Sequence, residues 1–258
     1  MAIDLKSLSR PTSGRPMVAT LFSEPGLGKT TLAAMFPRPV FIRTEDGTAS
    51  LDGHPDAMLF PVARSTSDVF DAIEALATQE HDRKTLVFDS VTQYEKIVTR
   101  EILDAESNPK AKNMAAAHGG YGKAFGMLDK RHQDLREAAD YLVTDCGMNV
   151  VFIAHATTEE MDLPDMDKYS RYTIQLHQNK QYNCVHHYAN NADMVAFVRL
   201  KTNLRGTDQG KKRAISDGER EIICFPVASN ISKNRYGITT PISFDLAGEF
   251  PFDKYVAK

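Results

Sequence analysis

The sequence has few cysteines, no excess of basic residues and no long apolar run. Its three cysteines are far apart and none belongs to a C-x-x-C pair, so neither a disulfide framework nor a zinc site is indicated. The formal net charge of −3 excludes a global basic field that would attract nucleic acid, which leaves any such contact to local patches. No apolar run approaches the ~20 residues that cross a bilayer, and the polar residues 1–16 lack the apolar segment of a signal peptide. We therefore expect a soluble cytoplasmic protein without a membrane partner.

Apolar residues are abundant enough for a large core, since 42% of the 258 residues are hydrophobic. We expect one α/β domain at residues 17–258, preceded by a short N-terminal arm at residues 1–16. Strand-like and helix-like patterns alternate, which is typical of a parallel sheet with helices on its faces. The expected strands are residues 17–22, 39–43, 58–63, 85–90 and 149–155, and the expected helices are 32–36, 65–79 and 123–144. Three later strand-like runs without a long helix between them predict an antiparallel C-terminal edge, at residues 193–200, 220–228 and 242–246.

One short segment combines the end of an apolar strand, a Gly-rich turn and the start of a helix. Its residues are Ser23, Glu24, Pro25, Gly26, Leu27, Gly28, Lys29, Thr30 and Thr31. In such a phosphate loop the backbone N–H groups point at phosphate oxygens, the lysine adds a positive charge and the threonine hydroxyl is a Mg²⁺ ligand. The usual pattern begins with Gly, where this chain has the small Ser23. The segment predicts that the protein binds ATP or another nucleoside triphosphate.

The apolar strand at residues 85–90 ends in an acid, Asp89. A carboxylate at the carboxyl end of a strand beside the phosphate loop would hold Mg²⁺ through water. The alternative, an aspartate that only caps the next helix, is disfavoured by the phosphate loop. We therefore predict that Thr30 and Asp89 form the metal site.

Three irregular segments are expected around this core. Residues 106–122 and 156–188 should form two long loops at one end of the sheet, close to the nucleotide. The connector at residues 201–218 should form a hairpin with a basic tip, although an ordinary solvated turn would have the same composition. The basic residues of the connector are Arg205, Lys211, Lys212 and Arg213.

Five segments, in order, resemble the RecA core, and in particular the compact phage RecA-like recombination ATPases. They are the phosphate loop and residues 41–45, 87–92, 152–155 and 232–235. The resemblance covers roughly residues 17–246 and implies a RecA-like P-loop NTPase with a mainly parallel twisted sheet flanked by helices. It also implies the cytoplasm of a host cell, if the protein is encoded by a phage.

The resemblance assigns roles to further residues. Glu45 matches the acid that orients the attacking water, with Asp46 as its neighbouring alternative; on its own, Glu45 would more often be an ordinary surface acid. His155 matches the polar residue that senses the γ-phosphate. Lys233 and Arg235 match cations that reach the active site of a neighbouring subunit, which implies a homo-oligomer or filament.

The same resemblance implies that residues 106–122 and 156–188 face single-stranded DNA. Basic side chains would meet the phosphates and tyrosines would stack on bases. The candidate phosphate contacts are Lys110, Lys112, Lys123, Arg171 and Lys180, and the candidate stacking residues are Tyr121, Tyr169, Tyr172 and Tyr182. Acids crowd the start of the second segment and should repel DNA there, namely Glu159, Glu160, Asp162, Asp165 and Asp167. DNA binding would then depend on the first loop, the later residues or the basic hairpin.

These observations predict a Mg²⁺-dependent ATPase that binds single-stranded DNA and promotes annealing or strand pairing in phage-type homologous recombination. A single-strand binding protein is a further expected partner. Two alternatives stay open: a RecA-type or AAA-type ATPase that acts on a protein partner as a loader or regulatory switch, and a non-catalytic interaction module that depends on ATP. Stimulation of turnover by single-stranded DNA would favour the recombination ATPase over the ATPase that acts on a protein. Tight ATP binding without turnover would favour the non-catalytic interaction module.

Overall fold

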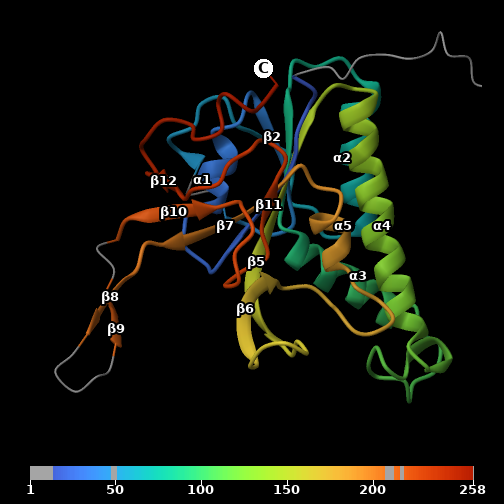
Figure 1. The fold of residues 1–258 in the computed structure, drawn as a ribbon. Helices are drawn as coiled ribbons and strands as arrows, with labels where there is room; N and C mark the ends of the chain where they lie inside the picture. Colours follow the sequence, from blue (N-terminus) through green and yellow to red (C-terminus); the bar gives the residue numbers. More distant parts are fainter. Residues whose placement is uncertain (1–13, 48–50, 207–211, 216–217, 258) are drawn as a thin grey trace, which may run out of the picture.

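The structure is a computed structural model that describes residues 14–47, 51–206, 212–215 and 218–257. It contains a ten-stranded sheet with helices on both faces (Figure 1), which confirms the predicted α/β fold of a P-loop NTPase. Most of the expected N-terminal arm lies outside the described residues. No helix in the described part of the chain is long and apolar enough to cross a bilayer.

The main path through the sheet runs β12-β10-β7-β1-β5-β4-β2-β3. These strands are β1 (Val18–Ser23), β2 (Pro39–Arg43), β3 (Met58–Leu59), β4 (Thr85–Asp89), β5 (Asn149–Met161), β7 (Met194–Leu200), β10 (Arg220–Ile223) and β12 (Ile242–Phe244). Neighbours from β7 to β3 are parallel, whereas β10 and β12 are antiparallel, as the expected C-terminal edge requires. Because β5 lies between β1 and β4, the carboxyl ends of these three strands meet at one edge.

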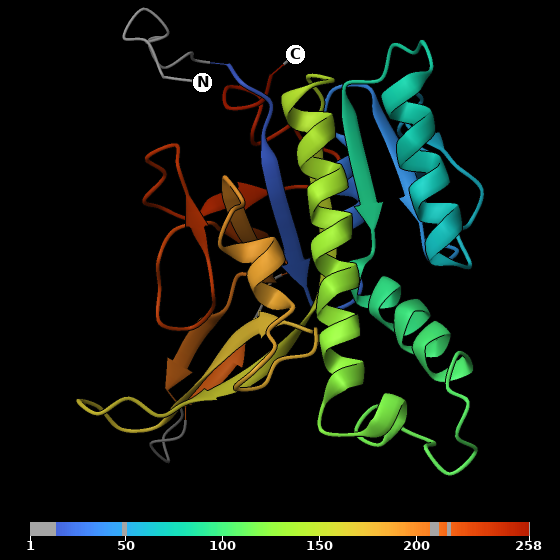
Figure 2. The ribbon, with the colours of Figure 1, turned by 90° about the vertical axis from the view of Figure 1, so that its right-hand side faces the viewer.

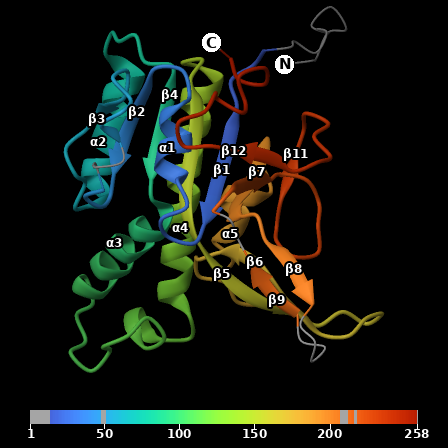
Figure 3. The same cartoon turned by 90° about the vertical axis from the view of Figure 1, so that its left-hand side faces the viewer.

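Helices cover the two faces of the sheet unequally. Figure 2 shows the first face under α2 (Thr66–Thr78), α4 (Lys123–Thr144) and α5 (Val185–Ala189), with α3 (Val91–Asp104) extending past the edge. Figure 3 shows the second face, where α1 (Lys29–Ala34) and the C-terminal residues lie. Alternate residues of a strand serve the two cores: Val40 and Ile42 pack under the first group of helices, and Phe41 packs with α1. Strands that are apolar on both faces are typical of buried parallel sheets.

Helix boundaries follow local signals in the sequence. Ser65 caps α2 in a capping box with Asp68, because each side chain accepts a backbone hydrogen bond from the other residue. Ser90 caps α3 by accepting from the backbone of Gln93. The helix expected at residues 123–144 is α4 with the same bounds.

The segment 156–188 is not a long irregular loop, so that expectation is wrong. β5 continues to Met161 and pairs antiparallel with β6 (Tyr169–Ile174), and α5 follows. The segment contains β-branched and aromatic residues at 157–158 and 172–174, which favour a paired strand once a partner is present. The acidic residues that suggested a loop belong to the outer part of this β5–β6 hairpin.

The other irregular segments are closer to expectation. Residues 106–122 contain only the 3₁₀ turn η3 (Ala117–Gly119). Residues 201–218 do form a hairpin, of β8 (Asn203–Gly206) and β9 (Lys212–Ile215), but Lys212 and Arg213 belong to a strand rather than the tip, and Lys211 lies outside the described residues. The strand expected at residues 58–63 is shorter, because only β3 pairs with β2.

Candidate nucleotide site

The phosphate loop connects β1 to α1 through two glycines with left-handed backbones. Gly26 has φ +78° and Gly28, directly before α1, has φ +91°. Residues with a Cβ rarely adopt these angles, which is the physical reason for glycine at both positions. A Cβ on Gly28 would also clash with the side chain of Leu246, which lies after β12 and packs on the loop.

Lys29 is held inside the loop. Its Nζ donates to Ser23 Oγ (3.1 Å), Ser23 O (3.3 Å) and Glu24 O (3.1 Å). Burial lowers the pKa of Lys29 to about 8, against the opposing effect of the Asp89 and Glu45 carboxylates. The serine that replaces the first motif glycine is therefore a direct partner of the lysine.

Thr30, in the first turn of α1, lies beside Asp89, the last residue of β4. Thr30 Oγ1 donates to Asp89 Oδ2 across 2.8 Å. Burial raises the pKa of Asp89, although Thr30 and Lys29 act in the opposite direction. A hydroxyl and a buried carboxylate at this distance are oxygen ligands of the kind that Mg²⁺ prefers, and a cation there would offset the cost of burying the charge. The donor set therefore fits Mg²⁺.

Glu45, two residues after the end of β2, lines the same cavity. Its Oε1 is 3.7 Å from His155 Nε2 and accepts a hydrogen bond from Ser90 Oγ at 3.5 Å. The interaction with His155 holds the pKa of Glu45 below its usual value, although partial burial opposes the shift. The neighbouring Asp46 instead pairs with Arg43 at 3.4 Å. Glu45 is thus the acid that contacts the other polar residues of the site.

Two threonines that the sequence analysis missed hold this arrangement. Thr44 Oγ1 donates to Ser90 O (3.0 Å) and accepts from Ser90 N (2.9 Å), which fixes the end of β4 beside Glu45. Thr92 Oγ1 accepts from His155 N at 3.0 Å. No local pattern distinguishes such threonines, because their partners are distant in sequence.

These groups surround one cavity of about 420 Å³, a volume within the usual range for ligand pockets. Its lining includes Gly28, Lys29, Thr30, Glu45, Asp89 and His155, with Phe41, Leu51 and Leu246 as apolar walls. A larger cavity of about 1160 Å³ shares Leu246 but contains none of the candidate site residues. The smaller cavity is therefore the candidate nucleotide site.

Comparison with known families agrees with this site. A family model described as an AAA domain matches residues 15–236, most of the chain. The chain belongs to this AAA-domain family. No curated protein matches it. Membership indicates a P-loop ATPase in general, consistent with a triphosphate held by the loop.

Lys233 and Arg235 lie on and directly after β11 (Lys233–Asn234), away from the phosphate loop of the same AAA domain. β11 pairs with the first residues of β7, next to the start of β1. Met194 and Val195 are in register with Ala19 and Thr20, so the phosphate loop, which begins at Ser23, lies about 10–13 Å further along β1 at ~3.3 Å per residue, and neither cation lines the nucleotide cavity. These two cations therefore do not join the cavity of their own chain.

The candidate DNA-binding residues differ in whether their side chains are free to meet a phosphate. Lys110, Lys112, Lys123 and Lys180 are exposed, whereas Arg171 forms an ion pair with Glu159 at 2.6 Å.

The tyrosines differ in their availability. Tyr121 is 98% exposed, but Tyr172 stacks on Phe197 in the core with ring centroids 4.8 Å apart. Stacking of Phe125 on His177, with ring centroids 4.2 Å apart, holds the first turn of α4, directly after the first loop, against the second segment.

A polar cluster of the core holds the second segment against α3. The backbone N–H of His177 donates to both carboxylate oxygens of Glu95, at 3.0 and 2.8 Å. Glu95 lies with His132 and Cys184, whose ligand atoms and that of Glu95 are all within 4.8 Å of one another. His132 Nδ1 is 2.7 Å from the Tyr188 hydroxyl, and burial lowers the pKa of His132. Because Thr92 and Glu95 are both on α3, this helix contacts both the nucleotide site and the second segment.

Proposed function

We propose that this AAA domain is a Mg²⁺-dependent ATPase that binds single-stranded DNA and promotes annealing or strand pairing in phage-type homologous recombination. The observation that carries the ATPase part is the meeting of Lys29, Thr30, Asp89 and Glu45 around one cavity. Each has the chemistry that its place in phosphoryl transfer requires.

Each residue of the site has a separate role in the proposed hydrolysis. Backbone N–H groups of the loop and the Lys29 ammonium bind the phosphates, and Thr30 with Asp89 would hold Mg²⁺. Bound Mg²⁺ neutralises charge on the phosphate oxygens. Glu45, kept ionised by its lowered pKa, orients water for in-line attack on the γ-phosphorus. His155, within reach of Glu45, donates toward the γ-phosphate and senses its presence.

Cations from a second copy would complete the site. Lys233 and Arg235 are too far along the sheet to reach their own phosphate loop, so a role in hydrolysis requires assembly. A cation that arrives at the γ-phosphate neutralises charge that develops during transfer. The proposed enzyme is accordingly a homo-oligomer or filament.

Two features support single-stranded DNA as the partner. The segment 106–122, which contains the exposed Lys110, Lys112 and Tyr121, lies beyond the carboxyl ends of the parallel strands, the end of the sheet that carries the phosphate loop (Figure 2). In addition, α3 contacts the nucleotide site through Thr92 and the second segment through Glu95. A change at the nucleotide can therefore reach the proposed DNA surface through one helix.

Charge on the β5–β6 hairpin favours a second candidate, an ATPase that acts on a protein partner. Asp162, Asp165 and Asp167 are exposed at the hairpin, and Lys168 pairs with Asp162 at 2.9 Å. An acidic surface of this kind repels a phosphate backbone and suits a basic protein segment.

The first test is ATP hydrolysis with and without single-stranded DNA at low and moderate salt, with Lys29→Ala as the blank. Salt-sensitive stimulation supports the recombination function, because phosphate contacts release counterions. Robust turnover that ignores DNA supports the protein-directed ATPase. Tight ATP binding without turnover contradicts both and supports a non-catalytic module.

A second test addresses the DNA surface itself. Tyr121→Ala should weaken binding of single-stranded DNA about tenfold, since stacking of one base contributes roughly 1–3 kcal/mol. The matched control is Tyr141→Ala, because Tyr141 is also exposed but lies near the far end of α4. Equal affinities of the two variants, measured by fluorescence anisotropy, would remove Tyr121 from the DNA surface.

A further inference from the structure

Three side chains of types that bind metal ions meet in the core between α3, α4 and α5. Glu95 belongs to α3, His132 belongs to α4, and Cys184 directly precedes α5. One ligand atom of each residue, namely a carboxylate oxygen, a ring nitrogen and Sγ, lies within 4.8 Å of the other two. None of the three lines the nucleotide cavity, so the cluster is separate from the site for ATP and Mg²⁺.

The ring of His132 distinguishes this cluster from ordinary polar packing. Its side chain is fully buried, and Nε2 approaches Glu95 Oε2 to 3.3 Å. Nε2 nevertheless has no hydrogen-bond partner among the described residues, because the ring is not aligned for a bond to that oxygen. Buried polar atoms almost always have a partner, and a cation bound by the nitrogen lone pair would be one.

Hydrogen bonds from outside the cluster orient all three ligands. His132 Nδ1 lies 2.7 Å from the Tyr188 hydroxyl, which leaves Nε2 to face the other two residues. The backbone of His177 holds both of those residues: its N–H donates to the two oxygens of Glu95, and its carbonyl oxygen accepts from Cys184 N at 3.0 Å. Metal sites typically have such an outer shell, which fixes the ligand directions.

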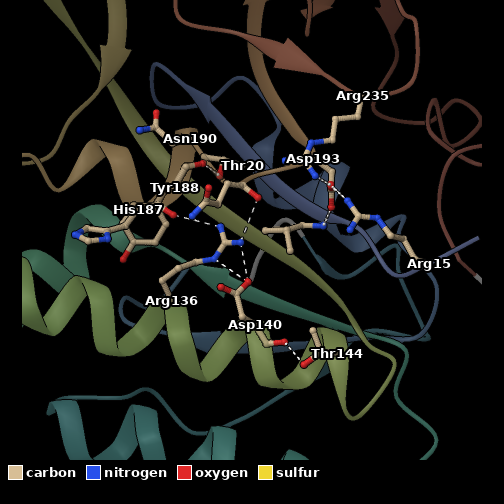
Figure 4. Close-up of polar contacts among 12 residues, drawn as sticks. Arg15, Thr20, Arg136, Asp140, Thr144, His187, Tyr188, Asn190, Asp193 and Arg235 are labelled. Carbon is tan, nitrogen blue, oxygen red and sulfur yellow. Dashed lines mark hydrogen bonds and ion pairs between the residues drawn. The ribbon is translucent and has the colours of Figure 1, made fainter. Parts of the chain in front are cut away.

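The outer shell is itself held by the core, as Figure 4 shows for Tyr188. Thr20 Oγ1 on β1 donates to Tyr188 O at 2.6 Å. Arg136 Nη1 on α4 donates to the preceding carbonyl oxygen, of His187, at 3.2 Å. The tyrosine that orients His132 is therefore fixed between the sheet and α4.

The donor set and its spacing fit Zn²⁺. A thiolate, an imidazole and a carboxylate are all zinc ligands, whereas Mg²⁺ and Ca²⁺ select oxygen ligands. Two ligand atoms at ~2.0–2.1 Å from a tetrahedral Zn²⁺ lie about 3.3 Å apart, which is the distance from His132 Nε2 to Glu95 Oε2. The two negative charges of a thiolate and a carboxylate would balance the charge of the ion. The Glu95 side chain is 20% exposed, which opens the fourth coordination position to water.

From this geometry we infer that Glu95, His132 and Cys184 bind one Zn²⁺ ion, with water as the fourth ligand. A bond forms between zinc and Cys184 Sγ, and the thiol proton leaves to solvent. The ion joins α3 and α4 to the start of α5 and so fixes the second segment in the core. This inference does not rest on the proposed function.

Cobalt substitution in the full-length protein tests the inference. Chelator-treated protein is titrated with Co²⁺ in excess Mg²⁺ and without nucleotide. We expect one Co²⁺ per chain, a thiolate-to-cobalt charge-transfer band in the near ultraviolet, and loss of both on addition of one equivalent of Zn²⁺. The Thr30–Asp89 site has only oxygen ligands and gives no such band.

Two cysteine variants identify the ligand. Cys184→Ser keeps the shape of the side chain, should abolish the charge-transfer band, and should weaken Zn²⁺ binding about 100-fold or more, since an outer-shell partner alone contributes about 10–100-fold. Cys224→Ser is the matched control, because Cys224 is also buried and free but packs in the other core cluster. It should keep the band and the affinity of the wild type.

Tyr188→Phe tests the outer shell. It removes only the hydroxyl that orients His132, so the band should remain while the affinity for Zn²⁺ falls about tenfold. Thermal unfolding gives an independent measurement: Zn²⁺ at about 100 times its Kd should raise the Tm of the wild type by about 5–10 °C and leave that of Cys184→Ser unchanged.

The wild-type titration alone can overturn the inference, even if a variant fails to fold. Absence of the charge-transfer band in the wild type would show that Cys184 binds no metal. A band that survives in Cys184→Ser and disappears in Cys224→Ser would place the metal elsewhere. Because no ATP turnover is measured, these outcomes are independent of whether the proposed function holds.

Discussion

Affinity for ATP should fall steeply as pH rises through the pKa of Lys29. Burial lowers that pKa to about 8 in the free protein, so the ammonium that binds phosphate is largely lost at higher pH. Bound phosphates favour the charged form, and binding above pH 8 must therefore take up a proton. Between pH 7.5 and 9.5 the charged fraction of free Lys29 falls about 20-fold, which corresponds to roughly 1.8 kcal/mol of binding free energy.

The free energy of unfolding of the protein without nucleotide should rise over the same pH range. The pKa of Lys29 is about 8 in the folded chain against an ordinary value of 10.5. Between these values the unfolded chain binds more protons than the folded one, so the free energy of unfolding rises with pH. The Lys29 contribution across this window is at most roughly 3 kcal/mol, taken as the difference from Lys29→Met.

Titration of MgATP by calorimetry across this pH range checks the reasoning. Lys29→Arg is the control. A guanidinium stays charged throughout this range, so the affinity of this variant for MgATP should not vary with pH. The range begins above the region where the γ-phosphate itself titrates. A wild-type dissociation constant that stays constant from pH 7.5 to 9.5 would refute the argument. Equal slopes for wild type and Lys29→Arg would do the same.

Three further perturbations follow from the structure. Gly28→Ala should lower the free energy of unfolding by about 1 kcal/mol more than Gly26→Ala. Both glycines have positive φ, but only the new Cβ at residue 28 requires the Leu246 side chain to shift. Thermal unfolding measures this, and equal effects would show that Leu246 does not constrain the loop. Glu45→Gln should reduce single-turnover hydrolysis about 100-fold or more and leave the affinity for MgATP unchanged, and an unchanged rate would exclude Glu45 as the residue that orients water. Ser65→Ala should cost about 1 kcal/mol through the lost cap of α2, a fall of roughly 2–4 °C in Tm, without any effect on ATP binding.

Signals that lie within a few residues of one another predicted much of the fold. The phosphate loop needs two glycines, a lysine and a threonine in one turn, so its presence can be read directly from residues 23–31. Ser65 and Asp68 mark the start of α2 for the same reason, since both partners of the capping box belong to one turn. The helix expected at residues 123–144 has the bounds of α4 in the structure.

Strand pairing was harder to predict because its stability depends on a partner elsewhere in the chain. Residues 156–161 look like an acidic loop in isolation and become a strand only when residues 169–174 pair with them. Tyr172 illustrates the same limit. It was expected to stack on DNA bases, but in the structure its ring stacks on Phe197 of β7.

The sequence by itself determined that the chain has a phosphate loop and a strand that ends in Asp89, because both signals are local. Only the tertiary structure decided which residues complete the site. β5 inserts between β1 and β4 and brings His155 to Glu45, and Leu246 packs on Gly28 from the C-terminal edge. Asp193 meets the start of β1 although it is 175 residues from Val18. Contacts across such separations arise from the order of strands in the sheet, which no short window of residues encodes.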